Sequence, residues 1–275
     1  MSSKELSSST PEIMRQNVMK DEFGWEVPVE SIPLPTKGVI YHPDSTLFNR
    51  EVLQIKSMTA REEDILASPA FHKEGTSLTH LIQSCLIDKS INSDEMITGD
   101  RMALMVGIRV TGYGPEYNAS ANCKSCNRLN EFVVDLSKLG IKRLKINPLR
   151  SGENKFEFVL PVTKKKIVFK YATERDNRER NTALKNMQKA LGNSISNSIT
   201  SFLENSIVSV DGITDRSKIR HFVLNMPAFD SKSLRTFIID NEPGMDMTCS
   251  FDCTSCGHRN ESILPMTTEF FWPSK

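Results

Sequence analysis

The sequence lacks any long apolar run. Among its 275 residues, no stretch approaches the roughly 18 consecutive apolar residues that a membrane-spanning helix needs. The first ten residues, Met1 to Thr10, also lack the apolar core of a signal peptide, so we expect no secretion. In a cytosolic protein, six cysteines favour reduced thiols or a bound metal over disulfides. We therefore expect a cytosolic chain without a membrane span.

A dominant charge of one sign is also absent. The formal net charge is +1, which gives no global reason to bind nucleic acid or an anionic membrane. Two basic clusters, Lys164-Lys165-Lys166 and Lys142-Arg143, nevertheless keep one alternative open. Zinc ribbons with nearby basic strands can bind nucleic acid, so a nucleic-acid-binding regulatory protein is the alternative function.

Signatures of catalysis are scarce. The chain has five histidines, none in a pattern that identifies a general base or a pair of metal ligands: His42, His72, His80, His221 and His258. Two glycines in Gly112-Tyr-Gly-Pro-Glu lack the spacing and the following helix of a nucleotide-binding loop, so we interpret them as a turn. We predict no catalytic residues, no organic cofactor and no small-molecule substrate.

The most informative feature present is a pair of Cys-x-x-Cys motifs, Cys123–Cys126 and Cys253–Cys256. Each has the spacing with which a short knuckle turn presents two thiolates to one zinc ion. The sequence therefore predicts one structural zinc ion bound by Cys123, Cys126, Cys253 and Cys256. Such a four-cysteine site is closed, because it leaves no coordination position for water or substrate.

Other interpretations of the cysteines remain open. The four thiols could be reduced and paired by chance, or one pair could be redox active, although nothing thioredoxin-like surrounds either pair. Cys249 or His258 could replace one of the four ligands. Cys85 lies on the apolar stripe of a predicted helix, which favours packing in the core.

The distance between the motifs predicts the organisation of the chain. The 126 residues from Asn127 to Asp252 are too many for a simple ribbon, so the chain must leave the site and return to close it. We predict an α+β fold with an α/β N-terminal half and a four-Cys zinc ribbon, formed by two knuckles, that a mostly helical insertion interrupts. The expected divisions are residues 1–24 as a disordered or partner-binding arm, 25–116 as the N-terminal α/β region, 117–136 plus 245–275 as the split ribbon and aromatic tail, and 137–244 as a hairpin plus helical insertion.

Local patterns predict individual elements. Three prolines within Val27–Gly38 favour an extended, polyproline-like segment that spaces a tail or lies along a partner. Leu53–Met58 begins as a strand, and Thr59 with Glu62 forms a capping box that starts a helix. Further predicted elements are helices over about 76–87, 173–191 and 195–207, helix starts at Asp215 and Asp230, a hairpin over 156–171, and an apolar helix or helix-to-strand passage over 101–110.

The tail, Glu269-Phe-Phe-Trp-Pro-Ser-Lys, carries three consecutive aromatic residues. Exposed together they would promote aggregation. We expect them either to dock on the core beside the zinc site or to insert into a partner.

Several phrases of the sequence form an ordered pattern: Pro33–Tyr41, Met58–Leu66, Gly99–Arg109, the two cysteine pairs and the terminal Phe-Phe-Trp-Pro. From about residue 25 to the end, this pattern resembles the T4-type baseplate hub and hub-assembly proteins of contractile-tailed bacteriophages. The resemblance implies a non-enzymatic structural or assembly role, with other hub and tail proteins as partners. It also implies action in the host cytoplasm during assembly, with the virion baseplate as a further location. It supplies no catalytic residues, and the zinc prediction rests on cysteine spacing alone.

Overall fold

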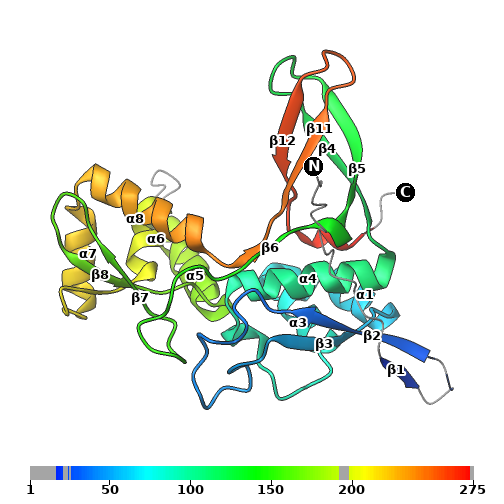
Figure 1. Cartoon of the computed structure of the whole chain (residues 1–275), viewed down its shortest axis with the longest axis horizontal. Helices are drawn as coiled ribbons and strands as arrows, with labels where there is room; N and C mark the ends of the chain where they lie inside the picture. The colour runs from blue at the N-terminus through cyan, green and yellow to red at the C-terminus, as the bar shows by residue number, and fades with distance from the viewer. Residues whose placement is uncertain (1–16, 21–23, 25, 192–197, 273–275) are drawn as a thin grey trace, which may run out of the picture.

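The computed structural model describes residues 17–20, 24, 26–191 and 198–272. Figure 1 shows an α+β architecture in three parts: a base of helices and a sheet, a mostly helical part beside it, and a narrow double hairpin that projects from the base. None of the helices in these ranges has the length and apolar character to cross a membrane. The mixture of helices and small antiparallel sheets confirms the α+β class. The division of the sequence into four regions stays a prediction.

The base contains a three-stranded antiparallel sheet in the order β1-β2-β3, made of β1 (Asn17–Lys20), β2 (Glu26–Pro33) and β3 (Val52–Lys56). The proline-containing segment is thus extended, but the prediction that it spaces a tail or lies along a partner was wrong for 27–33. Burial of Val29 and Ile32 explains the difference, because these side chains leave water only when the segment pairs in the sheet. Of residues 1–24, only β1 and Gly24 are described, and β1 is a paired strand rather than part of a disordered arm.

The base also contains four helices: α1 (Ala60–Ala67), α2 (Pro69–Glu74), α3 (Ser77–Cys85) and α4 (Thr98–Tyr113). Of these, α4 packs against β2 and β3, and α3 packs against α4. The capping box starts α1 as predicted, since the Glu62 carboxylate accepts the Thr59 N–H at 2.9 Å. The predicted helix at about 76–87 corresponds to α3, where Cys85 is fully buried in the core. The apolar stretch 101–110 is helical throughout and forms the central, buried part of α4.

A buried carboxylate ties α4 to the segment before β3. Asp100 accepts the Thr36 N–H at 3.0 Å, the Thr36 hydroxyl at 2.5 Å and the Tyr41 hydroxyl at 2.7 Å. Because these groups are buried, each hydrogen bond also avoids the cost of an unpaired polar group. Two phrases of the resemblance, Pro33–Tyr41 and Gly99–Arg109, therefore meet in space.

The insertion combines a second small sheet with four helices. Its sheet has the order β7-β8-β9, with β7 (Phe156–Val159), β8 (Lys166–Phe169) and β9 (Ile207–Val210). The helices are α5 (Glu174–Leu191), α6 (Ser198–Ser206), α7 (Arg216–Leu224) and α8 (Ala228–Asn241). A short antiparallel pair joins β6 (Ile141–Lys142), near the start of the insertion, to β10 (Gly244–Met245), at its end. The chain therefore leaves and re-enters the base at the same place.

Two predicted helix starts in the insertion have different outcomes. Asp215 caps α7, because its side chain accepts the Lys218 N–H at 2.9 Å. Asp230 does not start α8, which begins at Ala228. Its carboxylate instead accepts the N–H groups of Val162 and Thr163 at 2.7 and 3.0 Å, and so holds the β7–β8 turn.

The projecting part consists of two antiparallel hairpins, β4 (Glu116–Asn122) with β5 (Leu129–Asp135) and β11 (Thr248–Asp252) with β12 (Arg259–Ile263). We call this part the double hairpin. Phe132 on β5 stacks on Phe251 on β11, with ring centroids 4.4 Å apart. The two hairpins, far apart in sequence, therefore pack face to face, and the turns that carry the cysteines lie at the free end (Figure 1).

Candidate metal centre

Both Cys-x-x-Cys segments form the same tight turn. The N–H of Cys123 donates to the Arg128 carbonyl at 2.9 Å, and the N–H of Cys253 donates to the His258 carbonyl at the same distance. The residue after each second cysteine has left-handed backbone, with φ of 56° at Asn127 and 68° at Gly257. Asparagine and glycine tolerate this conformation, which explains why two different sequences build equivalent knuckles.

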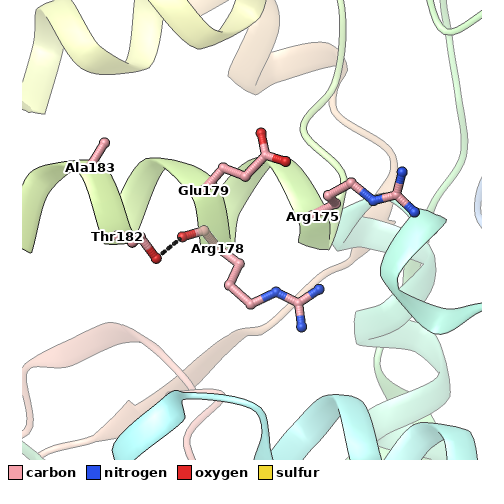
Figure 2. A pocket seen from close by; sticks show the side chains of 5 residues that line it. All are labelled: Arg175, Arg178, Glu179, Thr182 and Ala183. Carbon is pink, nitrogen blue, oxygen red and sulfur yellow. Dashed lines mark hydrogen bonds between the residues drawn. The ribbon is translucent and has the colours of Figure 1, made fainter.

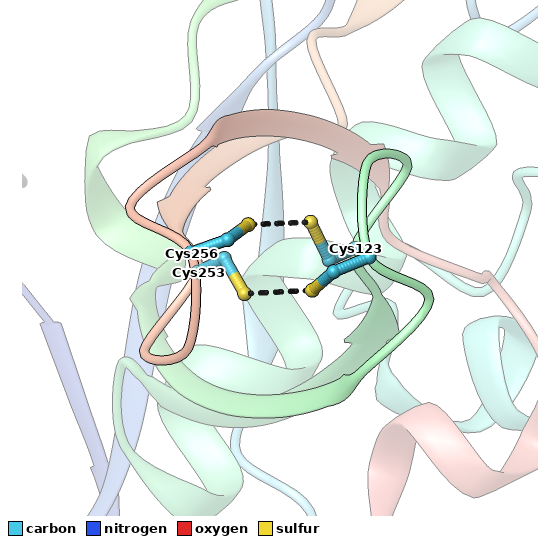
Figure 3. A group of neighbouring side chains, drawn as sticks. Cys123, Cys253 and Cys256 are labelled. Atoms are coloured by element: carbon cyan, nitrogen blue, oxygen red, sulfur yellow. Dashed lines mark hydrogen bonds between the residues drawn. The ribbon is translucent and has the colours of Figure 1, made fainter.

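The two knuckles bring the four predicted cysteines together (Figure 3). All four Sγ atoms lie within 4.8 Å of one another. Across the knuckles, Cys123 Sγ lies 3.7 Å from Cys256 Sγ, and Cys126 Sγ lies 3.6 Å from Cys253 Sγ. These separations are far longer than the roughly 2.05 Å of a disulfide bond. Zinc–sulfur bonds of about 2.3 Å in a tetrahedron put sulfurs about 3.8 Å apart, so the cluster could hold a metal ion.

Backbone amides favour the thiolate form of the first cysteine in each pair. The N–H of Cys256, followed by that of Ser255, lowers the pKa of Cys253 to about 6. The N–H of Cys126 likewise lowers the pKa of Cys123, and a second amide, from Ser125, lies 3.4 Å from its Sγ. Thiolates are the form that binds metal, so the turns prepare these cysteines as ligands.

The second cysteine of a pair has different surroundings. An Arg128 amide lowers the pKa of Cys126, but the neighbouring Cys256 and Cys253 thiols outweigh it and raise that pKa to about 11. Cys126 and Cys256 are also exposed, whereas Cys123 and Cys253 are buried. The thiolate form is thus favoured at Cys123 and Cys253 and disfavoured at Cys126.

Neither alternative ligand belongs to the group of four. Cys249 lies on β11 and its Sγ donates to the Ser262 carbonyl at 3.4 Å. His258 is exposed, and among the described residues the group that could hold a metal ion contains neither side chain.

Two residues near the cluster were not among the predicted site residues. Asn130 and Asn260 are buried, with 4% and 2% exposure, and each amide nitrogen lies within 3.6 Å of a cysteine sulfur. The sequence does carry a signal for them, because each stands seven residues after the first cysteine of its pair.

The aromatic tail docks on the core at the other end of the double hairpin. Phe270 and Phe271, in η3 (Thr268–Phe271), are buried, whereas Trp272 is 39% exposed. The Phe270 ring packs against Tyr117 near the start of β4, with centroids 5.1 Å apart. Docking on the core is thus confirmed for the two phenylalanines, but they lie at the root of the double hairpin rather than beside the cysteines.

The basic residues of the alternative function are dispersed, and at least four of the five have a partner in the structure. Their partners include the following: Lys165 pairs with Asp211, Lys166 with Glu157 and Lys142 with Asp246, and Arg143 donates to the Leu34 carbonyl. Residues 164–166 belong to the β7–β8 hairpin of the insertion and residues 142–143 lie at β6, so the described structure does not gather them beside the cysteines.

A hollow of about 480 Å³ lies along α5 and is open to solvent (Figure 2). Its lining consists of Arg175, Arg178, Glu179, Thr182 and Ala183. Arg175 pairs with Glu95 at 3.3 Å, and Arg178 pairs with Asp94. These ion pairs attach α5 to the base and give the arginines a structural role.

The family model described as T4 bacteriophage base plate protein matches residues 41–272. The chain belongs to this family. No curated protein and no solved structure matches it. Family membership confirms the resemblance to T4-type baseplate proteins and supports a structural role in the phage baseplate, with baseplate and tail proteins as partners.

Proposed function

We propose that this baseplate protein is a component of the baseplate hub, or a factor that assembles it, and that it acts by protein–protein contacts without catalysis. Support comes from the family match and from the resemblance of the sequence to hub and hub-assembly proteins. Assembly takes place in the host cytoplasm, and the finished baseplate is a further location of the chain.

The observation that carries the mechanism is the closed cluster of four sulfurs. Cys123, Cys126, Cys253 and Cys256 bind one structural zinc ion, which offsets half of the thiolate charge and fixes the two knuckles to each other. The donor set fits zinc, because four thiolates at tetrahedral spacing are typical of structural zinc sites. With all four positions taken by protein, the ion has no vacant position for a substrate.

Zinc would close a long loop of the chain. The first hairpin leaves the base after α4, and the second returns after the whole insertion, so the metal joins two cysteine pairs that have 126 residues between them. Because the four cysteines come together only in the folded chain, the free energy of metal binding stabilises the folded state and supports a rigid projection. In this proposal the double hairpin is the part that is presented to other hub subunits.

A phage that lacks this gene tests the hub assignment. Its particles should have baseplates without a complete central hub, as seen by electron microscopy, and the wild-type chain supplied from a plasmid should restore them. A complete hub in the absence of the chain would contradict the assignment.

The same complementation tests the zinc mechanism. Cys253→Ser should fail to restore the hub, because a serine hydroxyl is a poor zinc ligand. Cys249→Ser is the matched control, since this cysteine lies in the same hairpin but outside the cluster, and it should restore assembly. Full restoration by Cys253→Ser would show that assembly does not need the metal.

A further inference from the structure

The two buried asparagines connect the knuckles crosswise. On its own knuckle, the Asn130 amide nitrogen donates to the Arg128 carbonyl at 2.8 Å. Toward the opposite knuckle, the same nitrogen donates to Cys253 Sγ at 3.6 Å, and the amide oxygen accepts the Thr254 N–H at 2.9 Å. The same oxygen also accepts the Thr254 hydroxyl at 3.1 Å, so one side chain bonds four groups on two segments that are distant in sequence.

Asn260 repeats this arrangement in the other direction. Its amide nitrogen donates to the His258 carbonyl at 2.8 Å on its own knuckle and to Cys123 Sγ at 3.5 Å on the opposite one. Its oxygen accepts the Lys124 N–H at 2.9 Å. The pair of contacts therefore follows an approximate two-fold relation between the knuckles.

These contacts use the hydrogen-bonding capacity of each amide almost completely. An asparagine offers two N–H donors and one carbonyl acceptor, and here both ends of each side chain have partners. A buried amide is costly unless it is paired, so these side chains specify one register of the two knuckles. The contacts to Thr254 and Lys124 involve no metal and can form before one binds.

The contacts to sulfur act on the metal ligands themselves. Each asparagine donates to the buried, first cysteine of the opposite pair, which already receives amides from its own turn. Hydrogen bonds from outside the ligand set orient metal-bound side chains and tune their charge, and their loss typically lowers metal affinity about 10- to 100-fold.

We infer that Asn130 and Asn260 are reciprocal positioning residues: each sets the register of the opposite knuckle and stabilises that knuckle's first thiolate for the metal. The effect on the thiolates rests on the proposed zinc site. The effect on the register of the knuckles concerns the protein alone and can be tested without metal.

Hydrogen exchange of two amides tests the crosswise register. Asn130→Ala should lower the protection of the Thr254 amide at least tenfold and leave the Lys124 amide protected, whereas Asn260→Ala should do the reverse. Asn130→Asp keeps an oxygen acceptor and should keep Thr254 protected. Asn118→Asp, an exposed change on β4, is the matched control and should alter neither amide.

Equal loss of protection at both amides in each alanine variant would overturn the crosswise arrangement, because it would indicate general unfolding of the double hairpin. Unchanged protection of Thr254 in Asn130→Ala would overturn it as well. Exchange is measured on the full chain, both after chelation and with zinc added, so a chain that never binds metal still gives a result.

Metal binding tests the effect on the thiolates. By chelator competition, Asn130→Asp should bind zinc about 10- to 100-fold more weakly than wild type, because it loses an N–H donor and places a carboxylate beside a thiolate. With cobalt(II) in place of zinc, the sulfur-to-metal charge-transfer band of Asn130→Ala should move to lower energy, because an unbonded thiolate holds its electrons less tightly. Wild-type affinity and band position in these variants would overturn the effect on the thiolates, whereas the absence of metal binding in the wild-type chain would instead contradict the proposed zinc site.

Discussion

Arg109 holds the root of the double hairpin, and its replacement gives a quantitative test of the fold. The guanidinium is buried on α4 and donates to three backbone carbonyls: Phe270 at 3.1 Å, Gly114 at 2.8 Å and Glu116 at 3.0 Å. These groups belong to the docked tail, the end of α4 and the start of β4. One side chain therefore joins the tail and the first hairpin to the base.

The size of the effect follows from the carbonyls that lose their donor. Each buried carbonyl left without a donor costs about 1 to 3 kcal/mol. The variant no longer buries the charge of the guanidinium, and this gain offsets part of the summed cost. We expect Arg109→Met to lower the free energy of unfolding by about 3 kcal/mol. Arg109→Lys should cost less, about 2 kcal/mol, because an ammonium group can still reach one of the carbonyls.

Urea denaturation measures the change in stability, and limited chymotrypsin digestion reports cleavage after Phe270 and Phe271. Both variants should expose these buried sites to cleavage sooner than in wild type. Arg143→Met is the control, because it removes the hydrogen bond to the Leu34 carbonyl and a charge near Asp100 but does not touch the tail. Stability within about 0.5 kcal/mol of wild type, with an equally protected tail, would refute the role of Arg109.

Two further predictions concern the base and the double hairpin. Burial alone would raise the pKa of Glu62, but hydrogen bonds from Lys56 and its other neighbours outweigh it and lower that pKa from 4.5 to about 2. The ionised group therefore stabilises the fold by at most about 3 kcal/mol above pH 4.5, and this stabilisation is lost as the pH falls toward 2. In urea titrations, Glu62→Gln should be less stable than wild type at pH 7, and the difference in the free energy of unfolding should narrow by pH 3. A difference that stays constant with pH would contradict this. Phe132→Ala should cost about 2 kcal/mol in thermal unfolding by removing the stack on Phe251, whereas the exposed Val133→Ala should be near neutral, and equal effects of the two would refute the packing.

The sequence predicted those interactions whose partners lie only a few positions apart in the chain. The Thr59–Glu62 capping box and the Asp215 cap involve residues three positions apart, so the pattern contains the whole interaction. The four cysteines were found for a similar reason, because each knuckle is a short turn with fixed spacing. Their convergence followed from chemistry, since two thiolates alone make half a structural zinc site.

Interactions between distant segments were harder to predict. The proline-containing segment β2 forms a strand because it pairs with β1 and β3 and buries Val29 and Ile32. The local composition does not indicate these partner strands. Arg109 shows the same limit, because its partners are carbonyls, which every residue carries. Aligning the two cysteine motifs would have singled out Asn130 and Asn260, because each stands seven residues after the first cysteine of its pair. Their crosswise contacts, however, depend on the face-to-face packing of the hairpins.

Native mass spectrometry of the full-length chain tests most directly whether one zinc ion joins the two knuckles. The measured mass should exceed the sequence mass by one zinc ion per chain, and a chelator should remove the ion. Cys123→Ser and Cys253→Ser should lose it, whereas Cys249→Ser should retain it. A folded chain that carries no metal, with all its thiols free, would show that zinc does not join the knuckles.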